Sequence, residues 1–255
     1  MYDFPEWYDI GYRWNTEQEC DFLTAVFARD ARRSVRRVVD IGCGSGRHLM
    51  ALARRGYHGV GCDVNEAMVR FARERAASLR LPVRFFCGDL RRLGLSGMFD
   101  AAFCLMDTLR YAVTDEELAD HFTTVARCVA PGGLYVVDCW MPNDERRIGR
   151  ESYDWEQTVD EVTVQVAYRQ HPESLDWTRR TFEDELAFEV RQDERRTCID
   201  GGRVTTRFFL VAEWTAFCHR LKDFELVEQF AGFDLEQPYH VPSQSWRMVT
   251  VLRRR

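Results

Sequence analysis

Three glycines at alternate positions, Gly42, Gly44 and Gly46, follow the apolar and largely β-branched residues 38–41. A helical pattern then runs from 47 to 55. Glycine tolerates positive φ and lets backbone approach a ligand closely, and the start of a helix carries free N–H groups and partial positive charge. This strand, turn and helix predict a binding site for a negatively charged or strongly hydrogen-bonding ligand.

The spacing of these residues indicates which ligand is bound. A dinucleotide fingerprint counted from Gly42 requires a small third residue at position 47, where this chain has Arg47. The pattern is instead Asp40-x-Gly42-x-Gly44-x-Gly46, which resembles motif I of the class I S-adenosylmethionine-dependent methyltransferases. The resemblance implies that Asp40 ends the first strand and that the turn passes under the methionine part of the cofactor.

A second carboxylate, Asp63, ends the short apolar run 59–63. Folds of this kind place a carboxylate here on the ribose hydroxyls of a nucleotide. The alternative is that Asp63 caps the predicted helix 66–79, a role for which Asn65 is equally suited. In the family, the acid precedes a short motif whose apolar residue covers the adenine, and Val64, Asn65 and Met68 match it.

A third strand, beginning at 83, ends in Gly88-Asp89-Leu90. This resembles the family motif in which a carboxylate accepts from the adenine amino group and the next backbone N–H meets a ring nitrogen. The alternative is an ordinary Gly-Asp turn.

The fourth strand leads into a polar turn before the predicted helix 115–129, as motif IV of the family does. The resemblance implies that Asp107, Arg110 and Tyr111 stand over the transferable methyl group and that Asp100 is structural. A Pro-Gly-Gly turn and a fifth strand follow, again in the family's order.

The resemblance thus implies S-adenosylmethionine as cofactor and S-adenosylhomocysteine as product. In an aromatic N-terminal segment, 7–14, Tyr12 is the preferred contact, although these rings equally suit an anchor on the core. The predicted cofactor contacts are Tyr12, Asp40, Gly42, Cys43, Gly44, Gly46, His48, Asp63, Val64, Met68, Gly88, Asp89, Leu90, Cys104 and Met106.

Methyl transfer requires mainly positioning and, for an amine or hydroxyl acceptor, a base. Asp107 is the first candidate for that base and His240, in the loop before the last strand, is the second; a lone loop histidine is more often structural or exposed. Arg110, Tyr111, Trp155 and Tyr168 are the candidates for lining the acceptor pocket. Carboxylates between 154 and 185 suit a cationic amine, but surface strands also carry such charges.

The composition of the chain narrows the classes of protein to which it could belong. The chain has 255 residues and a net charge of −6, which argues against a dedicated nucleic-acid binder. Its nine cysteines form no C-x-x-C pair, so we expect buried thiols, no metal site and a reducing compartment. The first residues lack the features of a signal peptide, and no apolar run is long enough to span a membrane, so a cytoplasmic location is expected.

After the fifth strand, a period-two alternation predicts antiparallel strands between 153 and 209, with a hairpin signal at 200–202. A helix over 209–221 and two closing strands over 224–230 and 248–252 follow. The predicted division is a cofactor-binding core with an N-terminal helix at 1–150, an inserted substrate cover at 151–209 and the rest of the core at 210–255. The insertion is equally suited to a homodimer contact.

The sequence therefore predicts an α/β protein with a doubly wound, Rossmann-like sheet of seven strands and an antiparallel β subdomain inserted after strand five. The predicted function is methyl transfer to a nitrogen or oxygen of a small molecule, resembling bacterial amino-sugar N,N-dimethyltransferases. The alternatives are a methyltransferase acting on RNA or protein, a non-catalytic S-adenosylmethionine-binding protein, and a nicotinamide-dependent oxidoreductase. Arg47 speaks against the last of these, as does the motif after strand three.

Overall fold

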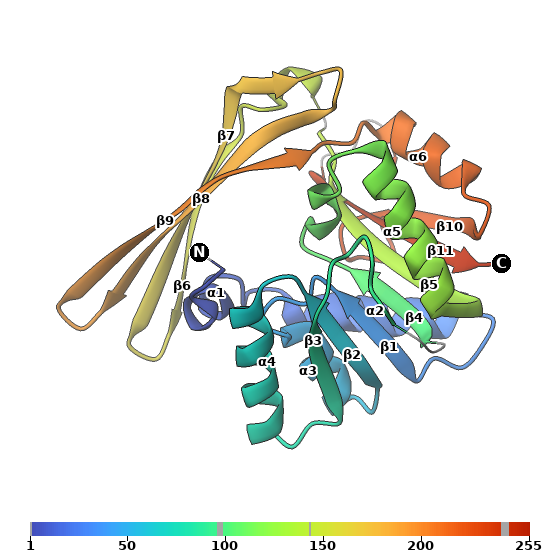
Figure 1. Cartoon of the computed structure of the whole chain (residues 1–255), viewed down its shortest axis with the longest axis horizontal. Helices are drawn as coiled ribbons and strands as arrows, with labels where there is room; N and C mark the ends of the chain where they lie inside the picture. The colour runs from blue at the N-terminus through green and yellow to red at the C-terminus, as the bar shows by residue number, and fades with distance from the viewer. Residues whose placement is uncertain (1, 96–98, 143, 241–244) are drawn as a thin grey trace.

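The computed structural model describes residues 2–95, 99–142, 144–240 and 245–255. Its strands form one seven-stranded sheet and one four-stranded sheet (Figure 1). The helices are α1 (Pro5–Gly11), α2 (Thr16–Asp30), α3 (Arg47–Arg54), α4 (Glu66–Ser78), α5 (Asp115–Cys128) and α6 (Val211–Arg220), with 3₁₀ helices η1 (Thr108–Tyr111) and η2 (Glu145–Arg147). The strands are β1 (Arg37–Ile41), β2 (His58–Asp63), β3 (Val83–Cys87), β4 (Phe99–Cys104), β5 (Val129–Trp140), β6 (Ser152–Val159), β7 (Val162–Asp176), β8 (Thr181–Gln192), β9 (Arg195–Arg207), β10 (Phe224–Ala231) and β11 (Arg247–Arg254).

The larger sheet has the strand order β10-β11-β5-β4-β1-β2-β3. Strand β1 pairs in parallel with both β2 and β4, so the order reverses beside it. Ligands of open α/β sheets bind at such a reversal, beyond the carboxyl ends of the strands. The turns after β1 and β4 are therefore placed to form a site.

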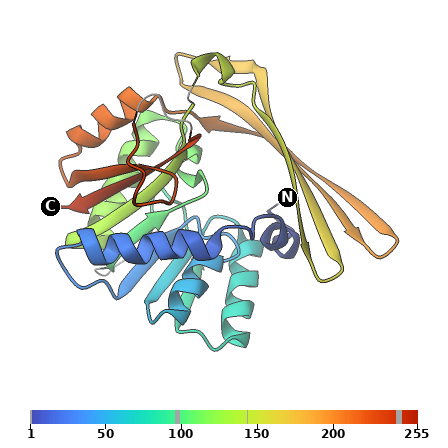
Figure 2. The same cartoon turned by 180° about the vertical axis from the view of Figure 1, so that it is seen from behind.

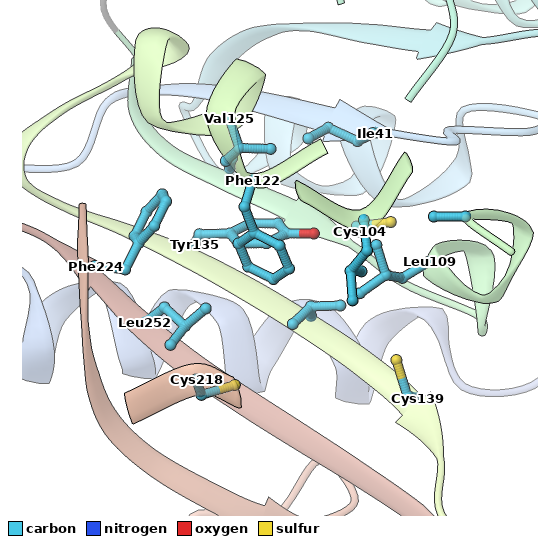
Figure 3. Close-up of a cluster of buried hydrophobic side chains, with 14 of the residues drawn as sticks. Ile41, Cys104, Leu109, Phe122, Val125, Tyr135, Cys139, Cys218, Phe224 and Leu252 are labelled. Atoms are coloured by element: carbon cyan, nitrogen blue, oxygen red, sulfur yellow. The ribbon is translucent and has the colours of Figure 1, made fainter. Parts of the chain in front are cut away.

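Helices cover both faces of this sheet (Figures 1 and 2). Side chains of α2, α3 and α4 pack on one face and those of α5 and α6 on the other. Figure 3 shows Phe122 and Val125 of α5 against Tyr135 of β5, with Phe224 of β10 beside them. Burying a large apolar side chain stabilises the fold by about 1.5–3 kcal/mol.

The closing strands β10 and β11 pair antiparallel, and β11 also runs antiparallel to β5. The predicted antiparallel end of the sheet is thus confirmed. The predicted turn before β5 is instead an irregular part of the strand, because the register with β4 shifts between Phe99 and Ala101. Asp100 accepts the backbone N–H groups of Arg36 and Arg37 at 3.0 and 2.8 Å, as expected for a structural residue.

The smaller sheet has the order β6-β7-β8-β9, with every neighbouring pair antiparallel. It lies between β5 and α6 in the chain, so the predicted β insertion is confirmed. Figure 1 shows it beside the main sheet, with α1 against β6. Tyr12 packs with Val164 and Val166 in this contact, and the indole Nε1 of Trp155 donates to Gly11 O at 2.9 Å.

Two N-terminal elements differ from the prediction. The aromatic segment overlaps the helix α1, which the sequence analysis did not predict. Helix α2 ends at Asp30 and not at 33, because Ala31 is extended and the N–H of Arg32 donates to Gly132 O at 2.9 Å. In the described part of the chain, no helix is long and apolar enough to cross a membrane.

Candidate active site

Three cavities meet at the carboxyl ends of β1 and β4. The Asp63 cavity, of about 430 Å³, lies along the ends of β2 and β3. The Asp40 cavity, of about 20 Å³, lies under the glycine turn, and the Asp107 cavity, of about 270 Å³, lies between that region and the inserted sheet. Tyr8 and Met106 line all three cavities, so the cavities are contiguous at these two residues.

The glycine turn is held against β2 by backbone bonds. The N–H groups of Gly42 and Cys43 donate to Cys62 O at 2.8 and 2.9 Å. Gly42 has φ +72°, and a Cβ there would lie 2.2 Å from Thr108 Cγ2, so only glycine fits. Gly42, Cys43 and Gly44 line the Asp40 cavity.

Asp63 connects this turn to α4. Its Oδ2 accepts the N–H of Gly44 at 2.8 Å and its Oδ1 accepts the N–H of Asn65 at 2.9 Å. Burial raises the pKa of its carboxyl group, against the lowering effect of these hydrogen bonds. Asn65 is the cap of α4 and accepts the N–H of Met68 at 3.0 Å, so the alternative cap role of Asp63 is not realised.

Apolar and polar groups both line the Asp63 cavity. Val64, which is 77% exposed, is part of this lining, as are Gly88, Asp89 and Leu90 after β3. Both carboxylate oxygens of Asp89 accept from Arg91, which lowers the pKa of Asp89. The cavity thus offers an exposed apolar side chain and carboxylates on two neighbouring strand ends.

Asp40 is buried without a complete set of partners. Its side chain lines the Asp40 cavity, the residue is 2% exposed, and its Oδ2 has no hydrogen bond to any described residue. Burial raises the pKa of Asp40 to about 8, although Arg47 opposes this. An unpaired buried carboxyl group is costly, so this atom is suited to a cationic ligand.

His48 also lines the Asp40 cavity, but its ring is held by a buried acid. Its Nε2 lies 2.5 Å from Glu19 Oε2. Burial raises the pKa of Glu19, but the hydrogen bond from His48 and the charges of His48, Arg247 and Arg47 outweigh it and bring that pKa to about 2. An ionised Glu19 can only accept, so Nε2 of His48 carries the proton.

A strained turn follows β4. Met106 and Asp107 have φ of +59° and +62°. Residues other than glycine seldom adopt such positive φ angles, and those that do are concentrated at functional sites. The N–H of Met106 donates to Asp138 Oδ1 at 2.7 Å, and Asp107 Oδ1 accepts the N–H of Trp140. Burial raises the pKa of Asp107, against the effect of Arg110, whose Nη1 lies 3.8 Å from Oδ2.

Arg110 is buried between the Asp107 cavity and the inserted sheet. Its Nη2 donates to Asp184 Oδ2 at 3.0 Å and to Thr206 Oγ1 at 2.7 Å. The other oxygen of Asp184 accepts from Tyr168 OH at 2.6 Å. This network joins the turn after β4 to β7, β8 and β9. Arg110, Tyr168 and Asp184 all line the cavity.

Aromatic rings dominate the rest of the Asp107 cavity. Tyr111 OH lies 2.6 Å from Tyr2 OH, and Tyr8 and Tyr12 stack with their ring centres 4.4 Å apart. The aromatic lining consists of Tyr2, Tyr8, Tyr12, Trp14, Tyr111, Trp140, Tyr153, Trp155, Tyr168 and Trp246.

Several predicted contacts lie elsewhere. Gly46 is the cap residue before α3, where a Cβ would lie 2.7 Å from the ring of Phe85, while Met68 and Cys104 are buried in the core. None of these three belongs to the described lining of the three cavities. His240 is exposed and is also absent from that lining. Tyr12 lines the Asp107 cavity only.

Other site residues were missed. Tyr8 lies in α1, one helical turn before Tyr12, and lines all three cavities, but the helix itself was not foreseen. Asp138 follows the apolar residues 134–137 near the end of β5, much as Asp40 follows Val38 and Val39 near the end of β1, which was an available signal. Asp184 is one of the many carboxylates between 154 and 185 that the sequence analysis treated together, and nothing local in the sequence distinguishes Arg247.

Comparisons with known proteins agree with this geometry. Residues 38–133 match the family model described as a methyltransferase domain. A putative methyltransferase, YqeM, from Bacillus subtilis (strain 168) is 33% identical over 103 residues, 40% of this chain and 41% of that protein. The dTDP-4-amino-2,3,4,6-tetradeoxy-D-glucose N,N-dimethyltransferase of Saccharopolyspora spinosa is 30% identical over 108 residues, 42% of this chain and 42% of that protein. The matches therefore span less than half the length of these curated relatives.

A solved structure matches nearly the whole chain. The S-adenosylmethionine-dependent methyltransferase from Clostridium acetobutylicum ATCC 824 has a TM-score of 0.79 at 17% identity, with 98% of this chain and 97% of that chain covered. Residues 38–133 are therefore similar to a methyltransferase domain, and the chain as a whole has the fold of that solved structure. The resemblance inferred from the glycine turn is confirmed.

Proposed function

We propose that this chain is an S-adenosylmethionine-dependent methyltransferase that methylates a nitrogen or oxygen of a small molecule. The observation that carries the proposal is the junction at Tyr8 and Met106, where the Asp63 and Asp40 cavities meet the Asp107 cavity. When bound, S-adenosylmethionine supplies a methyl group on a positively charged sulfur, which is electrophilic without further activation. A donor bound in the Asp63 and Asp40 cavities would present its methyl group at this junction to an acceptor bound in the Asp107 cavity.

The residues of the first two cavities fit this cofactor. The carboxylate of Asp63 would accept from the ribose hydroxyls, and Val64 would cover the adenine. Asp89 would accept from the adenine amino group through a lone pair that Arg91 leaves free. The unpaired Oδ2 of Asp40 would accept from the ammonium group of the methionine part.

Asp107 is suited to orient the acceptor and to take its proton. Oδ1 accepts the N–H of Trp140, which fixes the carboxyl group. Oδ2 lies 3.8 Å from Nη1 of Arg110. A carboxyl group with a raised pKa is a better base than an ordinary aspartate, because it holds the proton that it accepts. His240 is not proposed for this role, since its exposed side chain lies outside the cavity lining.

An amine is our first choice of acceptor. Aromatic faces attract cations, and the Asp107 cavity joins such faces to a carboxylate. The relative from Saccharopolyspora spinosa is named for N,N-dimethylation of an amino sugar, which supports the same choice. A hydroxyl acceptor is the second choice.

The test is methyl transfer from radiolabelled S-adenosylmethionine to a panel of small amines, amino sugars and phenols. We expect label in at least one amine, with turnover lost in Asp107→Asn and retained in His240→Ala. Label that enters only RNA or protein contradicts the small-molecule assignment. Tight binding of S-adenosylhomocysteine with no transfer to any acceptor indicates a non-catalytic binding protein.

Two predictions about organisation are retained as proposals. The first is the division into 1–150, 151–209 and 210–255, with the middle part covering the acceptor. The second is a homodimer through the inserted sheet. Light scattering and limited proteolysis test them.

A further inference from the structure

Arg47, the first residue of α3, lines the Asp40 cavity, although the sequence gave it no role beyond arguing against a dinucleotide. It is 9% exposed, and its Nε and Nη2 have no hydrogen bond to any described residue. Oε2 of Glu19 lies 3.7 Å from Nη2, but Glu19 already accepts from His48 and Arg247. A buried guanidinium group without hydrogen bonds is costly, so Arg47 is suited to a partner supplied by a ligand.

The two unpaired nitrogens of Arg47 form one edge of its guanidinium group. The N–H groups on this edge lie side by side and can bind both oxygens of a carboxylate. The same edge does so elsewhere in the chain. Nε and Nη2 of Arg29 donate to the two oxygens of Asp30 at 2.9 and 2.8 Å. Those of Arg180 donate to the two oxygens of Glu213 at 3.2 and 2.6 Å. The unpaired edge of Arg47 therefore fits a carboxylate group.

The Asp40 cavity also holds the opposite charge. Oδ2 of Asp40 has no hydrogen bond to any described residue, and Glu19 is the one carboxylate of the described chain within 4 Å of Arg47. Asp40 and Arg47 therefore do not form an ion pair with each other. Burial raises the pKa of Asp40 and of Tyr8, and the charge of Arg47 opposes both shifts, as expected for a guanidinium group close to them. One cavity thus contains a carboxylate and a guanidinium group that both lack a hydrogen-bond partner.

The size and position of this cavity suit the end of a longer ligand. The cavity is small, about 20 Å³, and it meets the Asp63 cavity at Tyr8 and Met106. An α-amino acid group carries an ammonium and a carboxylate on one carbon atom, and these match Oδ2 of Asp40 and the edge of Arg47. A phosphate would match Arg47 alone, because Asp40 would repel it.

We propose that Arg47 binds the carboxylate of the methionine part of the methyl donor while Asp40 binds its ammonium group. The inference rests on the S-adenosylmethionine site proposed above and adds Arg47 as the residue that selects a donor with an intact amino acid end. A donor analogue without the carboxylate leaves the buried guanidinium group unpaired, so it binds more weakly.

The first test compares two ligands by calorimetric titration of the full chain. One is S-adenosylhomocysteine, and the other is its decarboxylated analogue, which keeps the adenosine, the sulfur and the ammonium group. We expect the parent to bind S-adenosylhomocysteine roughly tenfold more tightly or better, because the analogue lacks the charged hydrogen-bond acceptor. Equal affinity for the two ligands overturns the role of Arg47 and leaves the proposed function intact. Absence of binding by either ligand overturns the proposed function as well.

The second test repeats both titrations with Arg47→Gln. S-adenosylhomocysteine should bind roughly tenfold more weakly than to the parent, while the analogue should bind no more weakly, so the preference for the carboxylate disappears. Equal weakening of both ligands would mean that Arg47 only maintains the shape of the cavity, which overturns the proposal.

Arg54→Gln is the matched control. Arg54 is an exposed arginine on the same helix, outside the described lining of the Asp40 cavity, and its replacement changes the net charge by the same amount. This variant should keep the full preference for S-adenosylhomocysteine. If it loses the preference as Arg47→Gln does, the preference depends on net charge and the assignment to Arg47 is wrong.

Discussion

The backbone N–H of Met106 donates to the side chain of Asp138 at 2.7 Å, which ties the turn after β4 to the end of β5. The second oxygen of Asp138 lies 2.8 Å from Nε of Arg247, and Nη2 of Arg247 lies 3.1 Å from the sulfur of Met106. Nη1 of Arg247 donates to Glu19 Oε1 at 3.1 Å, and the other oxygen of Glu19 accepts from Nε2 of His48. Since left-handed backbone at a non-glycine residue costs about 1–3 kcal/mol, this buried chain of ion pairs is what keeps the turn in place.

Replacing Arg247 by Met should destabilise the protein by about 3–5 kcal/mol, because it leaves Asp138 and Glu19 as buried carboxylates without their cation. Urea denaturation at pH 7 measures the loss. The loss should shrink as the pH falls below about 7, the value to which burial raises the pKa of Asp138 against the effect of Arg247, because a protonated Asp138 no longer needs the cation. Arg29→Met, which breaks a surface contact with Glu228, is the control and should cost less than about 1 kcal/mol. Equal losses in the two variants contradict the account.

Asp40 should make binding of S-adenosylhomocysteine depend on pH. Its pKa is raised to about 8 in the unliganded protein, while the ammonium group of the ligand favours the ionised form. Binding below pH 8 must therefore expel a proton, and affinity should rise with pH from 6 to 8 by up to about tenfold per unit. Calorimetry in two buffers of different ionisation enthalpy measures both the affinity and the released proton.

The same shift has a consequence without ligand. Because the folded pKa lies above the unfolded value, Asp40 binds more protons in the folded state, so its contribution to stability falls as the pH rises from about 4 to about 8. Asp40→Asn should remove this contribution and flatten the pH dependence of ligand affinity. An unchanged pH profile in the variant would show that another group titrates.

Asp107→Asn should lower kcat by about 10²–10⁴-fold and leave the affinity for S-adenosylhomocysteine within about twofold. The amide oxygen still accepts from the N–H of Trp140, so the turn is preserved, but the amide cannot take a proton. Rate measurements with saturating donor, together with calorimetry, separate the two effects. A parallel loss of donor binding would mean that the residue shapes the cofactor cavity and is not the base.

Tyr8 and Tyr12 form a matched pair, because they lie one turn apart in and just after α1 and only Tyr8 lines the Asp63 and Asp40 cavities. Tyr8→Phe should weaken S-adenosylhomocysteine binding by roughly tenfold, since it loses one hydroxyl hydrogen bond. Tyr12→Phe should change it less than about twofold. The reverse ranking in a calorimetric titration would restore the sequence-based choice of Tyr12.

The sequence predicted site residues best where the residue type is required both by the backbone conformation and by the chemistry of the site. Gly42 and Asp63 were predicted because the turn requires glycine and because parallel strands bring their carboxyl ends to one edge. Arg247 and Asp184 were not placed, because their roles depend on pairing between β11 and β5 and on how the inserted sheet meets η1. Met68 is buried in the core and outside the described lining of the three cavities, because a helix has several apolar positions and only packing decides which of them faces a cavity.

The measurement that tests the central claim most directly is the melting temperature of the parent and of Asp63→Ala with S-adenosylhomocysteine, S-adenosylmethionine and NAD. A ligand at about 100 times its Kd stabilises the folded state by about 2.7 kcal/mol. We predict that both sulfur compounds raise the melting temperature of the parent, that NAD does not, and that the variant loses the response. If neither sulfur compound shifts the transition, or if NAD shifts it more, the glycine turn and Asp63 do not form an S-adenosylmethionine site and the proposed function is wrong.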